Sequence, residues 1–400
     1  MTMTLSPVSS FHDRLSAWLT LDYSVGVSQA AVRRCLEHYG SPQAILDASQ
    51  QALSQLIGEA AAQALKSPNA DAASKRSAWV QAALTWLAAG EQGARHILCW
   101  DDPLYPAQLL TIPDPPMSLF VQGSAAVLQR PAVGIVGARN ATQQGVANAK
   151  VFAQHLAAQG VVVVSGMALG VDAAAHEGAL LSGMNDSETG DACTIAVVGT
   201  GIDRVYPAAH RDLAHRIAAR GAVVSEFPIG TPPLAANFPR RNRLISGLSR
   251  GVLVVEAAVR SGSLITARVA GEQGREVLAI PGSIHAPLSR GCHQLIKQGA
   301  KLVESGQDVL EELGLTAAMP FGRTKPAKST QLGDSGAEPA SESIDANPIL
   351  LAIGFAPTSL DQIMSATGLD AAAILPQLTE LELFGDIEAL PGGRYQRISA

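Results

Sequence analysis

The stretch Val133-Gly-Ile-Val136, followed by Gly137-Ala-Arg-Asn-Ala-Thr142, decides the fold. A short, continuously apolar run ends in glycine, and a helical segment begins after Thr142. Runs of the same kind recur at residues 161–164, 194–198, 222–225, 252–255 and 276–280, with helical segments between them. Continuously apolar strands are covered on both faces, and the intervening helices make crossover connections. The pattern predicts an α/β domain with a Rossmann-like, doubly wound, mostly parallel sheet.

Composition bounds the class of protein. The chain has 400 residues, 47% of them hydrophobic and only 4% aromatic, which suits a sheet covered by Ala-rich helices. A formal charge of −6 argues against a protein that coats a polyanion through bulk charge, so any such site must be local. The four cysteines form no CxxC pair, which predicts reduced thiols and neither a disulfide framework nor a metal site.

The regions on either side of this domain differ from it in pattern. Residues 1–100 are mostly helical, with breaks at 40–42 and 67–68, and predict a small SAM-like or helix-hairpin-helix-like domain. A Pro-rich connector then leads into an edge strand at 119–123, and the central domain is expected to span 101–315.

The end of the chain predicts a tethered module. Residues 316–346 are rich in Pro, Ser, Gly, Ala and Lys and predict a flexible linker. Residues 347–400 show helix, turn, helix and a Gly392-Gly393 turn, the pattern of a winged-helix domain.

Targeting signals are not legible. No basic segment followed by an apolar stretch opens the chain, and no run of 18 apolar residues occurs in it. We therefore expect a soluble, cytoplasmic protein without membrane contact.

The residues that follow the strands are the first candidates for a ligand site, because open parallel sheets bind ligands beyond the carboxyl ends of their strands. Arg139 places a full charge beside glycine and a helix N-terminus, whose free N–H groups attract anions. Backbone amides and hydroxyls at the other strand ends predict a cradle for several phosphates, although such glycines also occur where they only make tight turns. The cradle candidates are Ser165, Gly166, Gly199, Thr200, Gly201, Ser261, Gly262, Ser263 and Thr266.

The stretch Asn237-Phe-Pro-Arg-Arg-Asn-Arg243 indicates what the ligand is. Three arginines and an aromatic residue lie in seven positions, and no Asp or Glu occurs from 227 to 255. Arginine forks bind phosphate oxygens, and an aromatic ring can stack on a base. The alternative is that these arginines cap a helix and face water. In the context of the other strand ends, Phe238 and the set Arg240, Arg241, Asn242 and Arg243 favour nucleic acid.

Two further pairs have structural rather than chemical interpretations. Asp172 and His176 stand at i, i+4 on one helix, but no third metal ligand is near, so a structural hydrogen bond is expected. Asp203 before Tyr206-Pro207 predicts a rigid turn rather than an acid/base site.

Glu226 and Glu256 end two buried strands, where a carboxylate needs a partner. We expect each to orient a nearby arginine through a salt bridge rather than to catalyse a reaction.

The predicted winged helix is acidic. Residues 346–400 contain six carboxylates against two arginines, a balance of −4. A helix that reads duplex DNA needs Lys or Arg contacts to phosphates, so we expect this module to contact protein or to regulate rather than to read a DNA sequence.

From about Asp102 to Val303 the chain resembles the DNA processing protein A family (DprA, also called Smf). The motifs that carry the resemblance occur in order and are Asp102-Pro103-Leu-Tyr105-Pro106, Gly134 through Arg139, Ser165 through His176, Gly199 through Asp203, Tyr206-Pro207, Phe238 through Arg243, Glu256, Ser261 through Thr266 and Pro281-Gly282. The helical N-terminus and the winged-helix-like tail are similar to parts found in many members.

The resemblance implies a binding protein without a cofactor. Members bind single-stranded DNA on the Rossmann-like domain without sequence preference, form dimers, and load the RecA recombinase during natural transformation. By this resemblance, Arg139, Arg241 and Arg243 are phosphate contacts and Phe238 is a base-stacking residue. The dimer surface is expected at Leu295 and Ile296. Members often carry Ser at the position of Ala138, so one hydroxyl contact is absent here.

Two other classes of function remain open from the sequence. A nucleotide-processing hydrolase is one, with Glu256 at the Gly-rich edge. A dinucleotide-sensing regulator with a winged helix is the other, although Gly199-Thr-Gly201 lacks the third glycine of a dinucleotide fingerprint.

Overall fold

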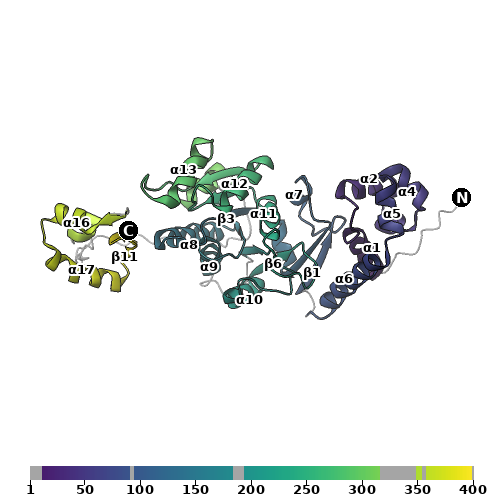
Figure 1. Ribbon diagram of the computed structural model, residues 1–400, viewed down its shortest axis with the longest axis horizontal. Helices are drawn as coiled ribbons and strands as arrows, with labels where there is room; N and C mark the ends of the chain where they lie inside the picture. Colours follow the sequence, from purple (N-terminus) through teal and green to yellow (C-terminus); the bar gives the residue numbers. More distant parts are fainter. Residues whose placement is uncertain (1–10, 91–93, 183–192, 316–347, 354–356, 399–400) are drawn as a thin grey trace, which may run out of the picture.

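The computed structural model describes residues 11–90, 94–182, 193–315, 348–353 and 357–398. Figure 1 shows three parts along the long axis: the N-terminal helices, the central sheet domain, and a small C-terminal unit beside the end of α8. The N-terminal part consists of α1 (Phe11–Asp22), α2 (Gln29–Tyr39), α3 (Pro42–Asp47), α4 (Gln50–Ile57), α5 (Glu59–Lys66) and α6 (Ala70–Ala88). The breaks predicted at 40–42 and 67–68 separate these helices, which confirms a helical N-terminal domain.

The central domain is a nine-stranded sheet in the order β1-β2-β6-β5-β4-β3-β7-β8-β9. Only the β1–β2 and β2–β6 pairings are antiparallel. The strands are β1 (Arg95–Cys99), β2 (Ser118–Gly123), β3 (Ala132–Val136), β4 (Val162–Ser165), β5 (Thr194–Val197), β6 (Gly221–Ser225), β7 (Gly251–Val254), β8 (Glu276–Ala279) and β9 (Lys301–Leu302). The mostly parallel, doubly wound sheet is confirmed.

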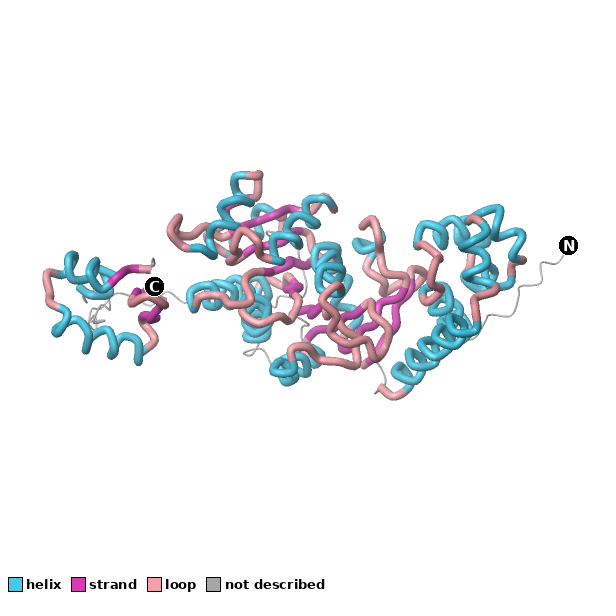
Figure 2. The backbone as a smooth tube through the Cα atoms, viewed as in Figure 1, coloured by secondary structure: helices cyan, strands magenta, loops and turns pink. Residues whose placement is uncertain are grey.

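Helices cover both faces of this sheet, as the cyan segments around the magenta strands show in Figure 2. One face packs α8 (Gln143–Ala158), α9 (Val171–Leu181), α10 (Arg211–Ala219) and α14 (Gly306–Glu312). The other packs α7 (Ala107–Leu110), α11 (Asn237–Gly247), α12 (Gly262–Glu272) and α13 (Arg290–Lys297). All four cysteines are buried free thiols, as their spacing predicted.

The strand order places the ligand edge. After β3 the chain builds β4, β5 and β6 on one side, then returns to add β7, β8 and β9 on the other. The carboxyl ends of β3 and β7 therefore flank the topological switch point, where open α/β sheets leave a crevice for ligands. Arg139 follows β3 and Arg260 follows β7.

Two features of the central domain were not foreseen. The edge strands β1 and β9 were not predicted, because β1 is only partly apolar and β9 has two residues. It also treated the N-terminal helices as separate, whereas Leu15, Trp18 and Trp86 share one hydrophobic core with Ile97 and Phe120. The first part of the chain is thus packed on the antiparallel end of the sheet.

The C-terminal unit comprises α15 (Pro348–Ile353), β10 (Thr358–Ser359), α16 (Leu360–Thr367), α17 (Ala371–Phe384), β11 (Ile387–Leu390) and β12 (Arg394–Arg397). Its strands form a three-stranded sheet in the order β10-β12-β11. Ile349, Ile363 and Leu378 lie in a core of its own, so the predicted winged helix is present. The linker expected at 316–346 lies outside the described residues. In the described part of the chain, no helix is long and apolar enough to cross a membrane.

Candidate nucleic-acid interface

A cavity of about 760 Å³ opens at the carboxyl edge of the sheet, beside the switch point. We call the loops that follow β3 to β8, at residues 137–142, 166–170, 198–207, 226–236, 255–261 and 280–286, the rim. The cavity walls combine cations, hydroxyls and apolar side chains from the rim and from α11 and α12. Five of the predicted strand ends therefore do meet at one edge.

Arg139 and Phe238 lie together on this cavity. Arg139 is exposed, and its guanidinium stands 5.7 Å from the centre of the Phe238 ring. Phe238 is half-buried, because Gly199 lies beneath it: a Cβ built on Gly199 would approach the ring to 3.2 Å. Asn237 fixes the start of α11 by donating from Nδ2 to the Gly199 carbonyl (3.0 Å). The glycine at 199 thus lets the ring lie a few tenths of an ångström closer to the sheet than a larger residue would.

Arg241 lies below the surface rather than on it. Its side chain is buried, and Nη1 donates to the carbonyls of Gly166 and Val197 at the ends of β4 and β5. A Cβ at Gly166 would collide with this guanidinium, which explains the glycine there. Burial lowers the pKa of Arg241 to about 10, and the nearby Asp172 carboxylate opposes that shift. We expected Arg241 to be an exposed phosphate contact. In the structure its side chain is buried and holds α11 against the sheet.

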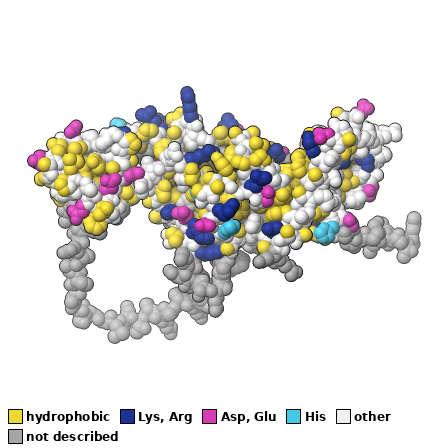
Figure 3. Space-filling model, turned by 60° about the horizontal axis from the view of Figure 1, so that its bottom comes forward, with side chains coloured by type: hydrophobic (Ala, Val, Ile, Leu, Met, Phe, Trp, Pro, Cys, Tyr) yellow, Lys and Arg dark blue, Asp and Glu magenta, His cyan; other side chains and the backbone are white. Residues whose placement is uncertain are grey.

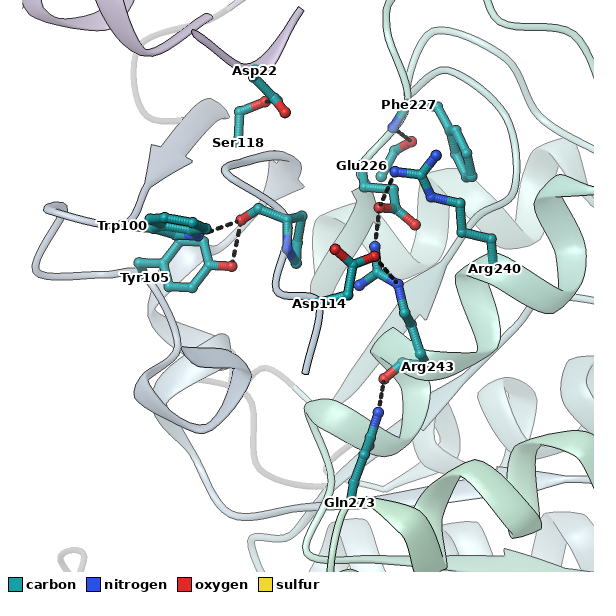
Figure 4. Close-up of polar contacts among 12 residues, drawn as sticks. Asp22, Trp100, Tyr105, Asp114, Ser118, Glu226, Phe227, Arg240, Arg243 and Gln273 are labelled. Carbon is teal, nitrogen blue, oxygen red and sulfur yellow. Dashed lines mark hydrogen bonds and ion pairs between the residues drawn. The ribbon is translucent and has the colours of Figure 1, made fainter. Parts of the chain in front are cut away.

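Arg243 is also held internally (Figure 4). Its guanidinium pairs with Glu226, whose side chain is 2% exposed, and its Nε lies 3.5 Å from Asp114. Burial raises the pKa of Glu226, and Arg243 opposes the shift. The expectation that Glu226 orients an arginine is correct. The exposed role expected of Arg243 is not what the structure has, because two carboxylates already neutralise it.

Arg240 is the exposed member of the same trio. Its side chain is 57% exposed, lies over the Phe227 ring at 5.7 Å, and reaches Glu226 only at 3.4 Å. In Figure 4 it extends along Phe227 on the opposite side of Glu226 from Asp114. This one longer ion pair, to a carboxylate already shared with Arg243, leaves most of the Arg240 guanidinium open to solvent and able to bind a phosphate.

The cradle residues divide into two groups. Ser261, Gly262, Ser263 and Thr266 line the cavity at the start of α12, where the Ser261 hydroxyl lies 2.7 Å from that of Ser263. Ser165 and Thr200 are buried and donate to the carbonyls of Ile135 (2.6 Å) and Arg204 (2.7 Å). Their hydroxyls hold the loops in place.

Gly201 supports the turn after β5. Its N–H donates to the Thr231 carbonyl at 3.0 Å, and the Asp203 carboxylate accepts from the Gly230 N–H at 2.8 Å. This is the rigid turn that the sequence predicted at Asp203.

The N-terminus of α8 already carries a carboxylate. Glu256 accepts hydrogen bonds from the Thr142 backbone N–H (3.0 Å) and hydroxyl (2.6 Å). Gly145 packs under Glu256, where any Cβ would collide with it. The expected anion site at this helix N-terminus is thus filled from within, and the expected pairing of Glu256 with an arginine is wrong.

His176 is packed, as predicted, but it is only half satisfied, because its buried Nε2 has no hydrogen-bond partner among the described residues. Its Nδ1 lies 2.7 Å from the Thr194 hydroxyl, and burial lowers its pKa to about 3. Asp172 instead faces Arg241, and burial raises its pKa. Among the described residues, no group of three or more His, Cys, Asp or Glu side chains is placed to hold a metal ion.

The sequence analysis left two cavity residues out of its candidate set, Tyr206 and Arg260. Arg260 is exposed and, among the described residues, neither it nor Arg139 forms an ion pair. The signal that could have found it is its position: it follows β7 at the switch point, as Arg139 follows β3. Asn242 also lines the cavity.

The candidate dimer residues lie on α13. Leu295 is buried within the domain core, and Ile296 is half-buried against it. Of the two, only Ile296 has surface to offer a partner.

A Rossmann-like domain with unpaired arginines around a cavity at its switch point, carrying a winged helix, defines a class of polyanion-binding proteins. The family model described as "DNA recombination-mediator protein A" matches residues 96–314, and that of the "DprA winged helix domain" matches residues 334–393. The chain belongs to the DNA recombination-mediator protein A family, which confirms the resemblance seen in the sequence.

Individual relatives agree with this assignment. Protein Smf of Escherichia coli is 42% identical over 316 residues, which cover 78% of this chain and 80% of that protein. DNA processing protein DprA of Streptococcus pneumoniae is 49% identical over 53% of this chain and 72% of its own. The X-ray structure of DprA from S. pneumoniae matches with a TM-score of 0.62 at 37% identity, covering 74% of this chain and 97% of that one.

Proposed function

We propose that this protein binds single-stranded DNA along the rim, without sequence preference, and acts as a recombination mediator. The observation that carries the proposal is a set of exposed arginines: Arg139 and Arg260 line one open cavity, and Arg240 is exposed on α11 next to Pro239 of the cavity wall. Guanidinium groups that are not neutralised by neighbours bind phosphate oxygens strongly and do so equally well for any sequence. The family to which the chain belongs supports the same ligand.

The roles of the sequence-predicted residues follow from their burial. Arg139 contacts phosphate, Arg240 does so by leaving Glu226, and the Ser261–Ser263 turn adds hydroxyls and N–H groups. Arg241 and Arg243 act as positioning residues that hold α11, and with it Phe238, against the sheet.

The proposal is of binding rather than catalysis. Glu256, the carboxylate that a nucleotide hydrolase would use at this edge, already accepts two hydrogen bonds from Thr142, the N-cap of α8, and is packed against Gly145. A carboxylate that accepts two hydrogen bonds from its own fold is a poor general base.

Two partners belong to the proposal. RecA recombinase would receive the bound strand, so addition of this protein should speed RecA assembly on a single-stranded oligonucleotide. A second copy of the chain would dock at the exposed part of α13 near Ile296. Light scattering of Ile296→Asp tests this, and a wild-type monomer would contradict it.

The direct test of DNA binding is fluorescence anisotropy with a single strand and a duplex of equal length. We expect tighter binding to the single strand, similar affinities for unrelated sequences, and a loss of roughly tenfold in Arg139→Ala. Arg268→Ala is the matched control, because Arg268 is exposed on α12 and pairs with Glu272 away from the cavity. Equal losses in both variants would contradict the proposal.

A further inference from the structure

Large apolar side chains stand exposed at the ends of successive strands. Each loop that follows β4, β5, β6, β7 and β8 exposes one. We call these residues the apolar row: Leu169 (49% exposed), Tyr206 (45%), Leu234 (50%), Val259 (54%) and Ile284 (73%).

The sheet order sets these side chains beside one another. Strands β6, β5, β4, β3, β7 and β8 are consecutive and parallel, so their carboxyl-end loops are neighbours along the rim. Neighbouring strands lie about 4.8 Å apart. Arg139 takes the place after β3, in the middle of the row. The rim therefore offers apolar surface and positive charge along the same line.

Tyr206 is the aromatic member of the row. Its ring centre lies 5.6 Å from that of Phe238, at an interplanar angle of 48°. Phe238 is enclosed by Gly199, Tyr206 and Arg139, whereas Tyr206 keeps nearly half of its surface free. Both rings line the cavity. The free aromatic surface at this site is therefore that of Tyr206.

We propose that Tyr206 is a base-stacking residue and that the apolar row receives the unpaired bases of the bound strand, with Phe238 as the support behind Tyr206. The inference rests on the proposed function and deepens it, because it says why the ligand is single-stranded. In a duplex the base faces are stacked on each other, so only a single strand can present them to the row.

The mixture of charges and apolar side chains favours a nucleic-acid strand over a protein partner. Arg139 and Arg260 lie on the same rim, and Arg240 is exposed on the adjoining helix α11. An apolar protein surface seated on the row would leave these guanidinium groups desolvated and unpaired, which is costly. A single strand supplies phosphates to the arginines and flat apolar bases to the row.

The test compares two oligonucleotides of equal length, one of thymidines and one of abasic sites, which keep the phosphates and lack the bases. Their affinities are measured for wild type, Tyr206→Ala, Tyr206→Phe, Phe238→Leu and Val151→Ala. Val151 is a matched control, because it is 63% exposed on α8 and outside the apolar row.

We expect Tyr206→Ala to lower the affinity for the thymidine strand by roughly tenfold. Its affinity for the abasic strand should stay within about twofold of that of the wild type. Tyr206→Phe keeps the ring and should bind both strands as wild type does. Val151→Ala should change neither affinity.

Each other outcome overturns a defined part of the account. Equal weakening of both strands by Tyr206→Ala, or weakening by Tyr206→Phe as large as by Tyr206→Ala, would make Tyr206 merely structural. If Phe238→Leu alone reduces the preference for thymidine, Phe238 holds the role proposed for Tyr206. If wild type binds neither strand, the proposed function itself fails.

Discussion

The central domain and the winged helix are both folds that commonly bind nucleic acid, yet their surfaces differ in charge. The rim carries exposed Arg139 and Arg260 at a cavity, and Arg240 is exposed on the adjoining helix α11. The winged helix has six carboxylates and two arginines in residues 346–400, and one of those arginines, Arg397, is buried. In Figure 3 the Lys and Arg side chains lie mostly over the central part, whereas acidic side chains are seen on the winged-helix end.

The fold of each region provides a surface that could bind nucleic acid, and the charges on the two surfaces determine which of them does so. Helix α17, which in a DNA-reading winged helix would enter the groove, carries Glu380 and Glu382 and exposes Leu383 and Phe384. Glu388 of the wing accepts a hydrogen bond from the Gln143 N–H of α8 (3.2 Å), and burial raises the pKa of Glu388. The module thus brings negative charge next to the rim.

The largest expected effect comes from removing the charge of the rim. Combined replacement of Arg139, Arg240 and Arg260 by Ala should lower the affinity for single-stranded DNA by roughly a thousandfold. Each lost charge-assisted contact is expected to reduce the affinity about tenfold. Anisotropy titrations measure it, with Arg268→Ala as the control. If the affinity of the triple variant falls by less than about tenfold, DNA binds at another surface and the contrast between the two regions is wrong.

The next effect separates exposed from buried arginines. Arg241→Ala leaves the carbonyls of Gly166 and Val197 without their donor and the buried Asp172 carboxylate without its nearby positive charge. We expect a loss of about 3 kcal/mol in the free energy of unfolding by urea. Arg139→Ala, an exposed change, should cost less than about 0.5 kcal/mol. Similar stabilities of the two variants would show that Arg241 is not a positioning residue.

A smaller effect concerns the contact of α1 with the sheet below the rim. The Asp22 carboxylate accepts a hydrogen bond from the Ser118 hydroxyl, and Glu226 and Arg240 face it. Burial raises the pKa of Asp22 from 3.8 to about 6, and the Glu226 charge adds to the rise. The folded state therefore holds the Asp22 proton more tightly than the unfolded state does.

The sign of the pH dependence follows. The stabilisation that comes from the protonated Asp22 is complete below the pKa of Asp22 in the unfolded state and is lost as pH rises through about 6. Wild type should gain on the order of 1–2 kcal/mol between pH 7 and pH 5 relative to Asp22→Asn, measured by urea unfolding at both pH values. If the free energy of unfolding changes equally with pH in the two proteins, a group other than Asp22 causes the change.

The smallest effect is that of the winged helix itself. Removal of residues 316–400 should change the affinity for single-stranded DNA by less than about threefold, and in the direction of tighter binding, because it removes net negative charge beside the rim. The same titration measures it. A loss of tenfold or more would show that the module contacts DNA and would end the contrast between the two regions.

The sheet could be predicted from the sequence, because short, continuously apolar runs such as 161–164 are typical of strands that are buried on both faces of a parallel sheet. It also placed Arg139 and the stretch Asn237–Arg243 at one edge, since parallel strands end on the same side. The short edge strands β1 and β9 lack such runs and were missed.

What the sequence could not give is which arginines are neutralised. Arg240, Arg241 and Arg243 are adjacent in the chain, yet helical geometry points Arg241 into the sheet, Arg243 to Glu226 and Arg240 to solvent. Neutralisation comes from Glu226 and Asp114, which are remote in sequence from one another. The cap formed by Glu256 on α8 is a contact of the same long-range kind.

The central claim, that exposed arginines of the rim hold the phosphates, is tested most directly by the salt dependence of single-strand affinity. The slope of log affinity against log salt is measured for wild type, Arg139→Ala and Arg243→Gln. We predict that Arg139→Ala lowers the slope by about 0.7, one phosphate's share, and that Arg243→Gln leaves it unchanged because Glu226 and Asp114 already neutralise Arg243. An unchanged slope in Arg139→Ala, or an equal fall in Arg243→Gln, would contradict the account.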